Sequence, residues 1–177
     1  TKRLLRKANI RSAKYEWFDN AERATHWLDE QEESPWVVKA DGLAAGKGAI
    51  VCKDRAEAIA AVRLILVERA FGAAGNELII EECLVGQETS ILAIVQGNTI
   101  IPLEASQDHK RALDNDEGPN TGGMGAYCPT PLVTPELMDK ILQDVLIPTV
   151  HALGVNEIPF QGILYAGIML TDDGPSV

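Results

Sequence analysis

The sequence predicts an α+β protein in which amphipathic helices pack against antiparallel strands. Apolar residues recur at helical spacing in three stretches, residues 19–31, 54–70 and 135–153. Short apolar runs separated by Gly-containing turns predict an antiparallel meander over 78–84, 89–95 and 99–103. With 177 residues, the chain is long enough for one domain or two small ones.

Composition excludes some classes of partner. The formal net charge of −10 argues against a surface that binds nucleic acid or anionic membrane. The three cysteines, Cys52, Cys83 and Cys128, are widely spaced and form no C-x-x-C pair. That spacing fits free thiols in a reducing compartment better than a disulfide framework or a zinc site. We therefore expect a cytoplasmic protein without nucleic-acid or membrane partners.

The expected helices have recognisable N-terminal caps. Asp19 stands three residues before Glu22, as in a capping box. Asp54 can cap the second helix, and Thr134 before Pro135 suits the start of the third. A shorter basic helix is expected over residues 1–8, and a final strand over residues 162–170.

The most informative stretch is the glycine-rich hairpin of residues 36–52. Two short apolar runs flank a loop that contains Gly42, Gly46 and Gly48, and lysines stand at 39 and 47. Glycine allows backbone N–H groups to approach a phosphate closely, and ammonium groups neutralise its charge. The pattern predicts a flap that folds over the phosphates of a nucleotide.

Two other interpretations of this hairpin are a P-loop and a mobile surface hairpin. A P-loop requires G-x-x-x-x-G-K-[ST] between a strand and a helix. Here Gly42 and Gly46 are one residue too close, Gly48 replaces the Ser or Thr, and the loop leads into a strand. The remaining alternative is a mobile surface hairpin with two solvated lysines, because glycine-rich turns are common.

Residues 106–127 form a long segment without periodicity. Such segments inside compact domains are usually functional or disordered. The mixture of charged residues with Gly122, Gly123 and Gly125 favours a binding loop over a linker. A calcium loop fits residues 114–118 poorly, because Gly118 occupies the fifth ligand position and no Glu closes the pattern.

Four motifs follow one another in the order VVKADGLAAGKG, IIEECLVGQE, SQDHKR and GPNTGGMGAY. Together they closely resemble the phosphoribosylamine–glycine ligases (glycinamide ribonucleotide synthetases) of the ATP-grasp superfamily. The resemblance runs from Trp36 to Leu170. It implies an ATP-grasp fold, in which two α+β subdomains grip ATP. The flap subdomain is then expected over residues 1–75 and an incomplete second subdomain over 76–177.

The resemblance also implies an ATP site. The phosphate-contacting residues of the flap would be Lys39, Gly46, Lys47 and Gly48. The hinge that lines the adenine pocket would be Glu81, Glu82, Cys83 and Leu84, and Glu88 would bind the ribose hydroxyls. Without the resemblance, Glu81 and Glu82 would be interpreted as solvated charges at a strand end.

The substrate site is implied in the same way. The resemblance places the amine and phosphate substrates at Asp108, His109 and Lys110 and at a glycine-rich loop comprising Asn120, Thr121, Gly122, Gly123 and Met124. The implied catalytic residues are Lys47, Asp108 and His109, since an aspartate can hold or deprotonate an attacking amine. Considered alone, His109 would more often be structural.

The activity implied is ATP-dependent ligation of glycine to 5-phosphoribosylamine in de novo purine biosynthesis. The reaction would pass through glycyl phosphate and give glycinamide ribonucleotide, ADP and phosphate. ATP with Mg²⁺ or Mn²⁺ would be required, and a monomer or weak homodimer is expected. Two alternatives stay open, another ATP-grasp carboxylate–amine ligase and a non-catalytic nucleotide-binding module.

Both ends of the sequence predict a fragment. A helix without an entry strand occupies residues 1–8, and Val177 falls where a hairpin partner of the last strand should begin. The family's metal ligands are a Glu-x-Asn pair, expected beyond Val177, so no metal ligand is assigned in this chain. The fragment alone is expected to be inactive.

Overall fold

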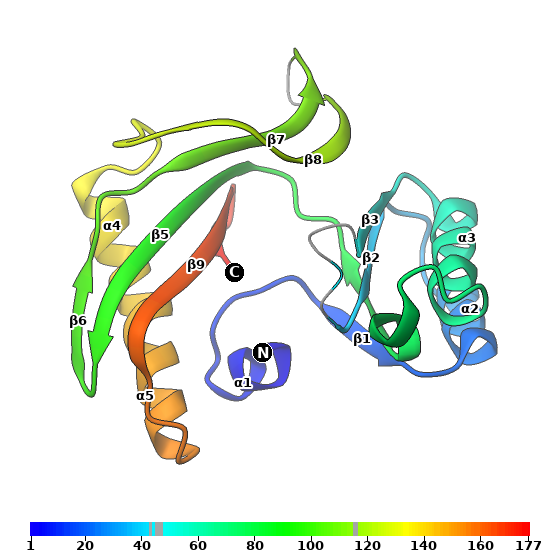
Figure 1. Ribbon diagram of the computed structural model, residues 1–177, viewed down its shortest axis with the longest axis horizontal. Coiled ribbons are helices and arrows are strands. Elements are labelled where there is room, and N and C mark those ends of the chain that lie inside the picture. The colour runs from blue at the N-terminus through cyan, green and yellow to red at the C-terminus, as the bar shows by residue number, and fades with distance from the viewer. Residues whose placement is uncertain (43, 45–47, 115–116) are drawn as a thin grey trace. The chain divides into compact units, whose positions relative to one another are not determined.

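The chain forms two compact units (Figure 1). The computed structural model describes residues 1–42, 44, 48–114 and 117–177, and of residues 117, 119 and 120 it describes the backbone only. The hairpin unit comprises residues 13–83, and the ribbon unit comprises residues 1–12 and 84–177.

The hairpin unit contains a four-stranded antiparallel sheet of order β1-β4-β2-β3. Its elements are β1 (Tyr15–Phe18), α2 (Ala21–Glu30), β2 (Trp36–Ala40), β3 (Ala49–Cys52), α3 (Arg55–Leu66), a 3-10 helix (Gly72–Asn76) and β4 (Leu78–Glu82). The two helices lie side by side on one face of the sheet (Figure 1). Leu28, Val38, Ile65 and Ile80 are fully excluded from solvent between the layers, and each such side chain contributes about 1.5–3 kcal/mol.

The starts of the three longer helices agree in part with the expected caps. Asp54 caps α3, since its Oδ1 accepts a 2.8 Å hydrogen bond from the Glu57 N–H. For α2 the expected cap was wrong by one residue, because Asn20, not Asp19, accepts from the Arg23 N–H at 3.0 Å. The third helix begins as expected, with Thr134 accepting from the Leu137 N–H at 3.3 Å.

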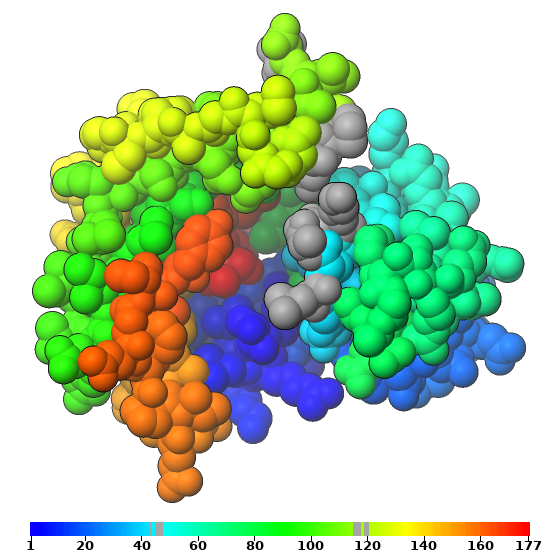
Figure 2. Space-filling view, viewed as in Figure 1, coloured from blue at the N-terminus to red at the C-terminus, as the bar shows by residue number. Residues whose placement is uncertain are grey.

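The ribbon unit is built on a second antiparallel sheet, of order β10-β9-β5-β6. Its strands are β5 (Gln87–Gln96), β6 (Thr99–Pro102), β9 (Gln161–Thr171) and β10 (Gly174–Ser176). The short helix α1 (Lys2–Lys7) and the later helices supply the rest of a core that includes Leu5, Ile91, Ile141, Leu146 and Ile168. Ile163 and Tyr165 of β9 are exposed, and part of this strand, coloured orange, is visible at the surface in Figure 2.

The expected meander over residues 78–103 is divided between the two sheets. β4 pairs with β1 and β2, whereas β5 and β6 form a hairpin that pairs with β9. Local turn signals do not specify the partner of β4, because strand pairing is a long-range choice. The units therefore divide at residues 83 and 84, not at the expected residues 75 and 76, and α1 packs with the later part of the chain.

The long third helix is interrupted. It consists of α4 (Pro135–Ile141), a π-helical turn (Leu142–Leu146) and α5 (Ile147–Val155). Pro148 has no N–H with which to donate to the carbonyl four residues earlier, and the wider turn lies directly before it. The Thr149 hydroxyl donates to the Val145 carbonyl at 2.6 Å within this irregular stretch.

The described part of residues 106–127 is not a structureless loop. It forms a two-stranded antiparallel ribbon of β7 (Gln107–Leu113) and β8 (Glu117–Tyr127). The register shifts twice along the ribbon, between His109 and Arg111 and again between Arg111 and Leu113. These irregularities and the polar composition of both strands explain why no regular alternation is visible in the sequence.

Candidate functional site

The hairpin unit holds an ion pair between two of the expected ATP-binding residues. Lys39 lies near the end of β2, and its Nζ is 2.8 Å from Oε2 of Glu81 on the neighbouring strand β4. The Glu81 side chain is 4% exposed, whereas that of Lys39 is 38% exposed. The ion pair therefore offsets the negative charge of the buried Glu81 carboxylate. It also fixes the position of the partly exposed Lys39 ammonium.

The expected adenine hinge is tied to the hairpin unit by its backbone. The N–H of Glu82 donates to the Lys14 carbonyl at 3.0 Å, and that of Cys83 donates to the Pro35 carbonyl at 3.4 Å. The Glu82 side chain also accepts from the Lys14 N–H at 2.9 Å. Glu82 therefore has a structural role here. For the Leu84 N–H, the part of the chain that the structure describes offers no hydrogen-bond acceptor.

The two ends of the glycine-rich loop are closely packed. The Ala40 N–H donates to the Gly48 carbonyl, and the Asp41 N–H donates to the Glu77 carbonyl, both at 2.9 Å. A Cβ at Gly42 would lie 2.6 Å from the Ala74 Cα, so this position requires glycine for close backbone approach. The expected phosphate contacts Gly46 and Lys47 lie outside the described residues.

The ribbon unit gathers a second set of expected residues at the start of β7. Lys110 Nζ lies 3.1 Å from Oε2 of Glu88 and 3.4 Å from Oδ2 of Asp108. Burial acts to lower the pKa of Lys110, but the hydrogen bond and negative charge of Glu88, with the charges of Tyr165 and Asp108, raise it overall. Lys110 is thus held as a cation between two carboxylates.

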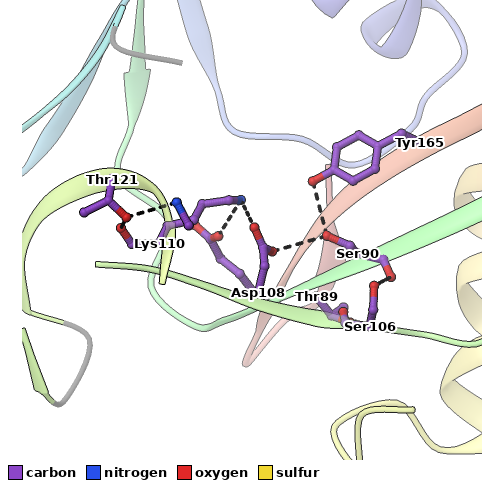
Figure 3. A network of polar contacts seen from close by, with 9 residues as sticks. Thr89, Ser90, Ser106, Asp108, Lys110, Thr121 and Tyr165 are labelled. Atoms are coloured by element: carbon purple, nitrogen blue, oxygen red, sulfur yellow. Dashed lines mark hydrogen bonds and ion pairs between the residues drawn. The ribbon is translucent and has the colours of Figure 1, made fainter. Parts of the chain in front are cut away.

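The start of the ribbon is anchored to the sheet at Ser106. Backbone bonds join Ser90 and Ser106 in both directions, at 2.7 and 3.0 Å. The Thr89 hydroxyl donates to the Ser106 carbonyl at 2.9 Å, and the Ser106 hydroxyl donates to the Ser90 carbonyl at 3.3 Å. Figure 3 shows Thr89, Ser90 and Ser106 to the right of Asp108, which lies two residues beyond Ser106, in β7.

Asp108 and His109, both expected to be catalytic, point to different surroundings. Asp108 contacts residues of β5, whereas the His109 ring stacks on Tyr127 of β8, with ring centroids 5.8 Å apart. The Tyr127 hydroxyl donates to the Gln107 side chain. Successive residues of a strand face opposite sides, so the structure groups Asp108 with Lys110 and groups His109 with Gln107 and Tyr127.

The glycine-rich strand β8 is the other half of the ribbon. The Thr121 hydroxyl donates to the Lys110 carbonyl at 2.8 Å and accepts from the Gly123 N–H at 3.0 Å. No atom lies within 4 Å of a Cβ built at Gly122 or Gly123, and Met124 is exposed. The strand therefore leaves open space beside its backbone at Gly122 and Gly123. The side chain of Asn120 lies outside what the structure describes.

Two residues beside Asp108 were not predicted from the sequence. Ser90 of β5 and Tyr165 of β9 join it in what we call the Asp108 cluster, whose members are Glu88, Ser90, Asp108, Lys110 and Tyr165. Nothing in the sequence distinguishes Ser90 and Tyr165 from ordinary strand residues, because the pairing of β5 with β9 brings them together.

Within residues 1–42, 44, 48–114 and 117–177, no group of three or more His, Cys, Asp and Glu side chains could hold a metal ion. The three cysteines are free thiols. Separately, no helix in the described part of the chain is long and apolar enough to span a bilayer.

Comparisons with known proteins agree with the resemblance in the motifs. The family model of the phosphoribosylglycinamide synthetase ATP-grasp (A) domain matches residues 1–177. Phosphoribosylamine–glycine ligase of Rhodopirellula baltica shares 51% sequence identity with this chain in an alignment that covers 99% of it. The ligase of Halalkalibacterium halodurans shares 48% identity, also over 99% of the chain. The chain spans 41% of the length of either relative.

The solved structures give the same answer for the fold. The crystal structure of phosphoribosylamine–glycine ligase from Thermotoga maritima superposes with a TM-score of 0.89 at 32% identity, covering 99% of this chain and 44% of that one. The α+β, ATP-grasp fold is therefore confirmed. The chain belongs to the phosphoribosylglycinamide synthetase family, as its ATP-grasp (A) domain.

Proposed function

We propose that the protein containing this chain joins glycine to 5-phosphoribosylamine at the expense of ATP. The observation that carries the proposal is the 51% identity to a phosphoribosylamine–glycine ligase over 99% of the chain. The products would be glycinamide ribonucleotide, ADP and phosphate, as a step of de novo purine biosynthesis. Since the chain spans only 41% of that relative, the activity is proposed for the whole protein and the fragment alone is expected to be inactive.

The chemistry requires two displacements. A glycine carboxylate oxygen attacks the γ-phosphorus of ATP, the bond to the β-phosphate oxygen breaks, and glycyl phosphate and ADP form. The amine nitrogen of 5-phosphoribosylamine then attacks the glycyl carbonyl carbon, phosphate leaves, and the nitrogen loses a proton. Because both steps join charged or polar groups, catalysis depends on positioning and on offsetting charge.

The residues of the hairpin unit fit the phosphates of ATP. The Lys39 ammonium has three donors, of which one is directed to Glu81. The others are available to phosphate oxygens, with Lys47, Gly46 and Gly48 as the further expected contacts. In the hinge, the Leu84 N–H is the donor best suited to the edge of a base, beside the backbone and side chains of Glu81, Glu82 and Cys83.

The residues of the ribbon unit fit the remaining substrates. Asp108 would accept a hydrogen bond from the attacking amine and take its proton, while Lys110 holds that carboxylate in place. The open backbone at Gly122 and Gly123 can approach a sugar phosphate, with Asn120, Thr121 and Met124 as expected neighbours. Glu88 is expected at the ribose hydroxyls. His109, which lies on the other side of β7 from Asp108, is expected at the substrate.

Mg²⁺ or Mn²⁺ is proposed to accompany ATP and would supply further charge neutralisation on the phosphates. Since the described residues provide no cluster of metal ligands, no step is assigned to the ion in this chain. A cytoplasmic location and a monomer or weak homodimer complete the proposal. Three free cysteines and a net charge of −10 support the compartment and the absence of nucleic-acid or membrane partners.

The test is ADP release by the full-length protein with ATP and Mg²⁺. We expect release when glycine and 5-phosphoribosylamine are both present, little release when either is omitted, and a product with the mass of glycinamide ribonucleotide. In the same assay, Lys47→Ala should lower turnover by orders of magnitude. Release with a different acid or amine would favour another ATP-grasp ligase, and ATP binding without any ADP release would favour a non-catalytic module.

A further inference from the structure

Ser90 and Tyr165 form a hydroxyl chain that ends on Asp108 (Figure 3). The Tyr165 oxygen lies 3.2 Å from the Ser90 Oγ, and that Oγ lies 3.5 Å from Oδ1 of Asp108. Ser90 is 7% exposed, whereas Tyr165 is 57% exposed. The chain thus leads from a phenol at the surface, through a buried hydroxyl, to the carboxylate that the proposed reaction uses.

The directions of these hydrogen bonds follow from the donor inventory. An ionised aspartate only accepts, so the single hydroxyl proton of Ser90 is directed to Asp108. Ser90 then has only lone pairs for Tyr165, and the phenol proton must point to Ser90. Lys110 forms an ion pair with the other Asp108 oxygen, with Nζ 3.4 Å from Oδ2. Both oxygens of the carboxylate are therefore oriented, one by a hydroxyl and one by an ammonium.

This arrangement leaves acceptors for a ligand. Each Asp108 oxygen retains a lone pair, and so does the hydroxyl oxygen of Tyr165, whose proton is directed to Ser90. Glu88 and Asp108 carry two negative charges against the single positive charge of Lys110. The Asp108 cluster consequently suits a group that donates N–H hydrogen bonds, which is the chemistry of an amine.

The position of the Tyr165 ring depends on Gly167, because a glycine has no side chain to occupy the space near the phenol. Gly167 is paired with Ser90 in the β5–β9 register, and Tyr165 is two residues away, on the same face of β9. A Cβ built at Gly167 would lie 3.3 Å from the Tyr165 hydroxyl oxygen. An alanine there would displace the phenol from Ser90 by a few tenths of an ångström without removing any hydrogen-bonding group.

We propose that Ser90 and Tyr165 are positioning residues that fix the Asp108 carboxylate toward the amine of the second substrate. This inference depends on the proposed function for the identity of that amine. Tyr165 acts through Ser90, and Ser90 acts on Asp108. The pair should therefore affect the amine-consuming step and leave the formation of the acyl phosphate unchanged.

The experiment compares the two steps in the full-length enzyme. Hydroxylamine replaces the second substrate and traps the acyl phosphate as a hydroxamate, which measures the first step alone. For Tyr165→Phe we expect kcat/KM for 5-phosphoribosylamine to fall about fivefold to tenfold, the effect of one lost hydrogen bond. Ser90→Ala should cost more, about tenfold to a hundredfold, because it leaves two groups without their partner. Gly167→Ala should give a smaller loss of the same kind.

Hydroxamate formation and KM for ATP should stay within twofold of the parent enzyme in all three variants. Tyr15→Phe, the same chemical change in β1 of the hairpin unit, serves as the control; because Tyr15 lies opposite Glu81, any effect should be on KM for ATP, and kcat/KM for 5-phosphoribosylamine relative to hydroxamate formation should stay unchanged. Unchanged kcat/KM in Tyr165→Phe would overturn the inference, as would an equal loss in both steps, since that indicates a general structural effect. If the parent enzyme forms neither hydroxamate nor product, the proposed function itself fails.

Discussion

The ammonium of Lys39 lies 2.8 Å from the buried carboxylate of Glu81, on the adjacent strand of the same sheet. The sequence motifs suggest that both residues face a nucleotide. The structure shows that they also contact each other, so that the residue proposed to bind phosphate is positioned by the hinge strand. Changes at either residue should therefore affect stability as well as nucleotide binding.

Removal of the Lys39 charge should destabilise the hairpin unit. Lys39→Met deprives the Glu81 carboxylate of a cation, and we expect the free energy of unfolding to fall by about 1–3 kcal/mol, less than for a fully buried pair because Lys39 is partly exposed. All three tryptophans, Trp17, Trp27 and Trp36, lie in this unit. Tryptophan fluorescence during urea unfolding therefore reports on it. Adding Glu81→Gln to Lys39→Met should recover part of the loss, and an unchanged midpoint in the single variant would contradict the prediction.

Lys110 should remain protonated to an unusually high pH. Because its pKa in the folded protein is raised above 10.5, its ion pair stabilises the fold fully below that pH. The contribution is lost only as the pH rises through the folded pKa. Titration of ¹³C-labelled lysine side chains by NMR should show Lys110 deprotonating after the exposed lysines. In Glu88→Gln the pKa should fall, since the main cause that raises it is removed while burial remains. An unshifted Lys110 signal in that variant would rule out this account.

A side chain at Gly86 should not be tolerated. A Cβ built there clashes with the backbone oxygen of Leu170, and backbone cannot move aside as a flexible side chain can. We expect Gly86→Ala to lower the free energy of unfolding by about 1–3 kcal/mol in thermal unfolding followed by circular dichroism. Gly154→Ala is the matched control, because no atom lies within 4 Å of its Cβ position. Equal melting temperatures for the two variants would show that the β5 and β9 backbones can separate.

Cys52 should be unreactive in the folded protein. Burial, with the charges of Glu57 and Asp54, raises its pKa from 9.0 to about 11, so little thiolate exists near neutral pH. In alkylation followed by mass spectrometry, exposed Cys128 should react rapidly and Cys52 only after unfolding. The raised pKa also means that Cys52 favours the folded state below about pH 9, and that this contribution fades as the pH approaches 11. Equal labelling rates for the two cysteines under native conditions would contradict the burial of Cys52.

Several features were correctly predicted because they depend on neighbouring residues. Asp54 and Thr134 cap their helices, and Gly97 adopts the positive φ of 57° that the tight turn between β5 and β6 requires. The hairpin strands β2 and β3 coincide with the two apolar runs that flank the glycine-rich loop. Caps and tight turns are decided within a few residues, so the sequence contains the information directly. The functional roles of Gly46 and Lys47 stay predictions, since both lie outside the described residues.

The sequence alone determined the family, through the order of four motifs, and the helices and turns whose hydrogen bonds are local. The tertiary structure decided which sheet β4 joins, that residues 107–113 pair with residues 117–127 as a ribbon, and that Asp108 and His109 face different sides of it. It also brought Ser90 and Tyr165 to Asp108, across three strands far apart in the chain. Pairing and facing of strands depend on contacts between distant residues, and a one-residue change of register reverses every side chain, so no local pattern could specify them.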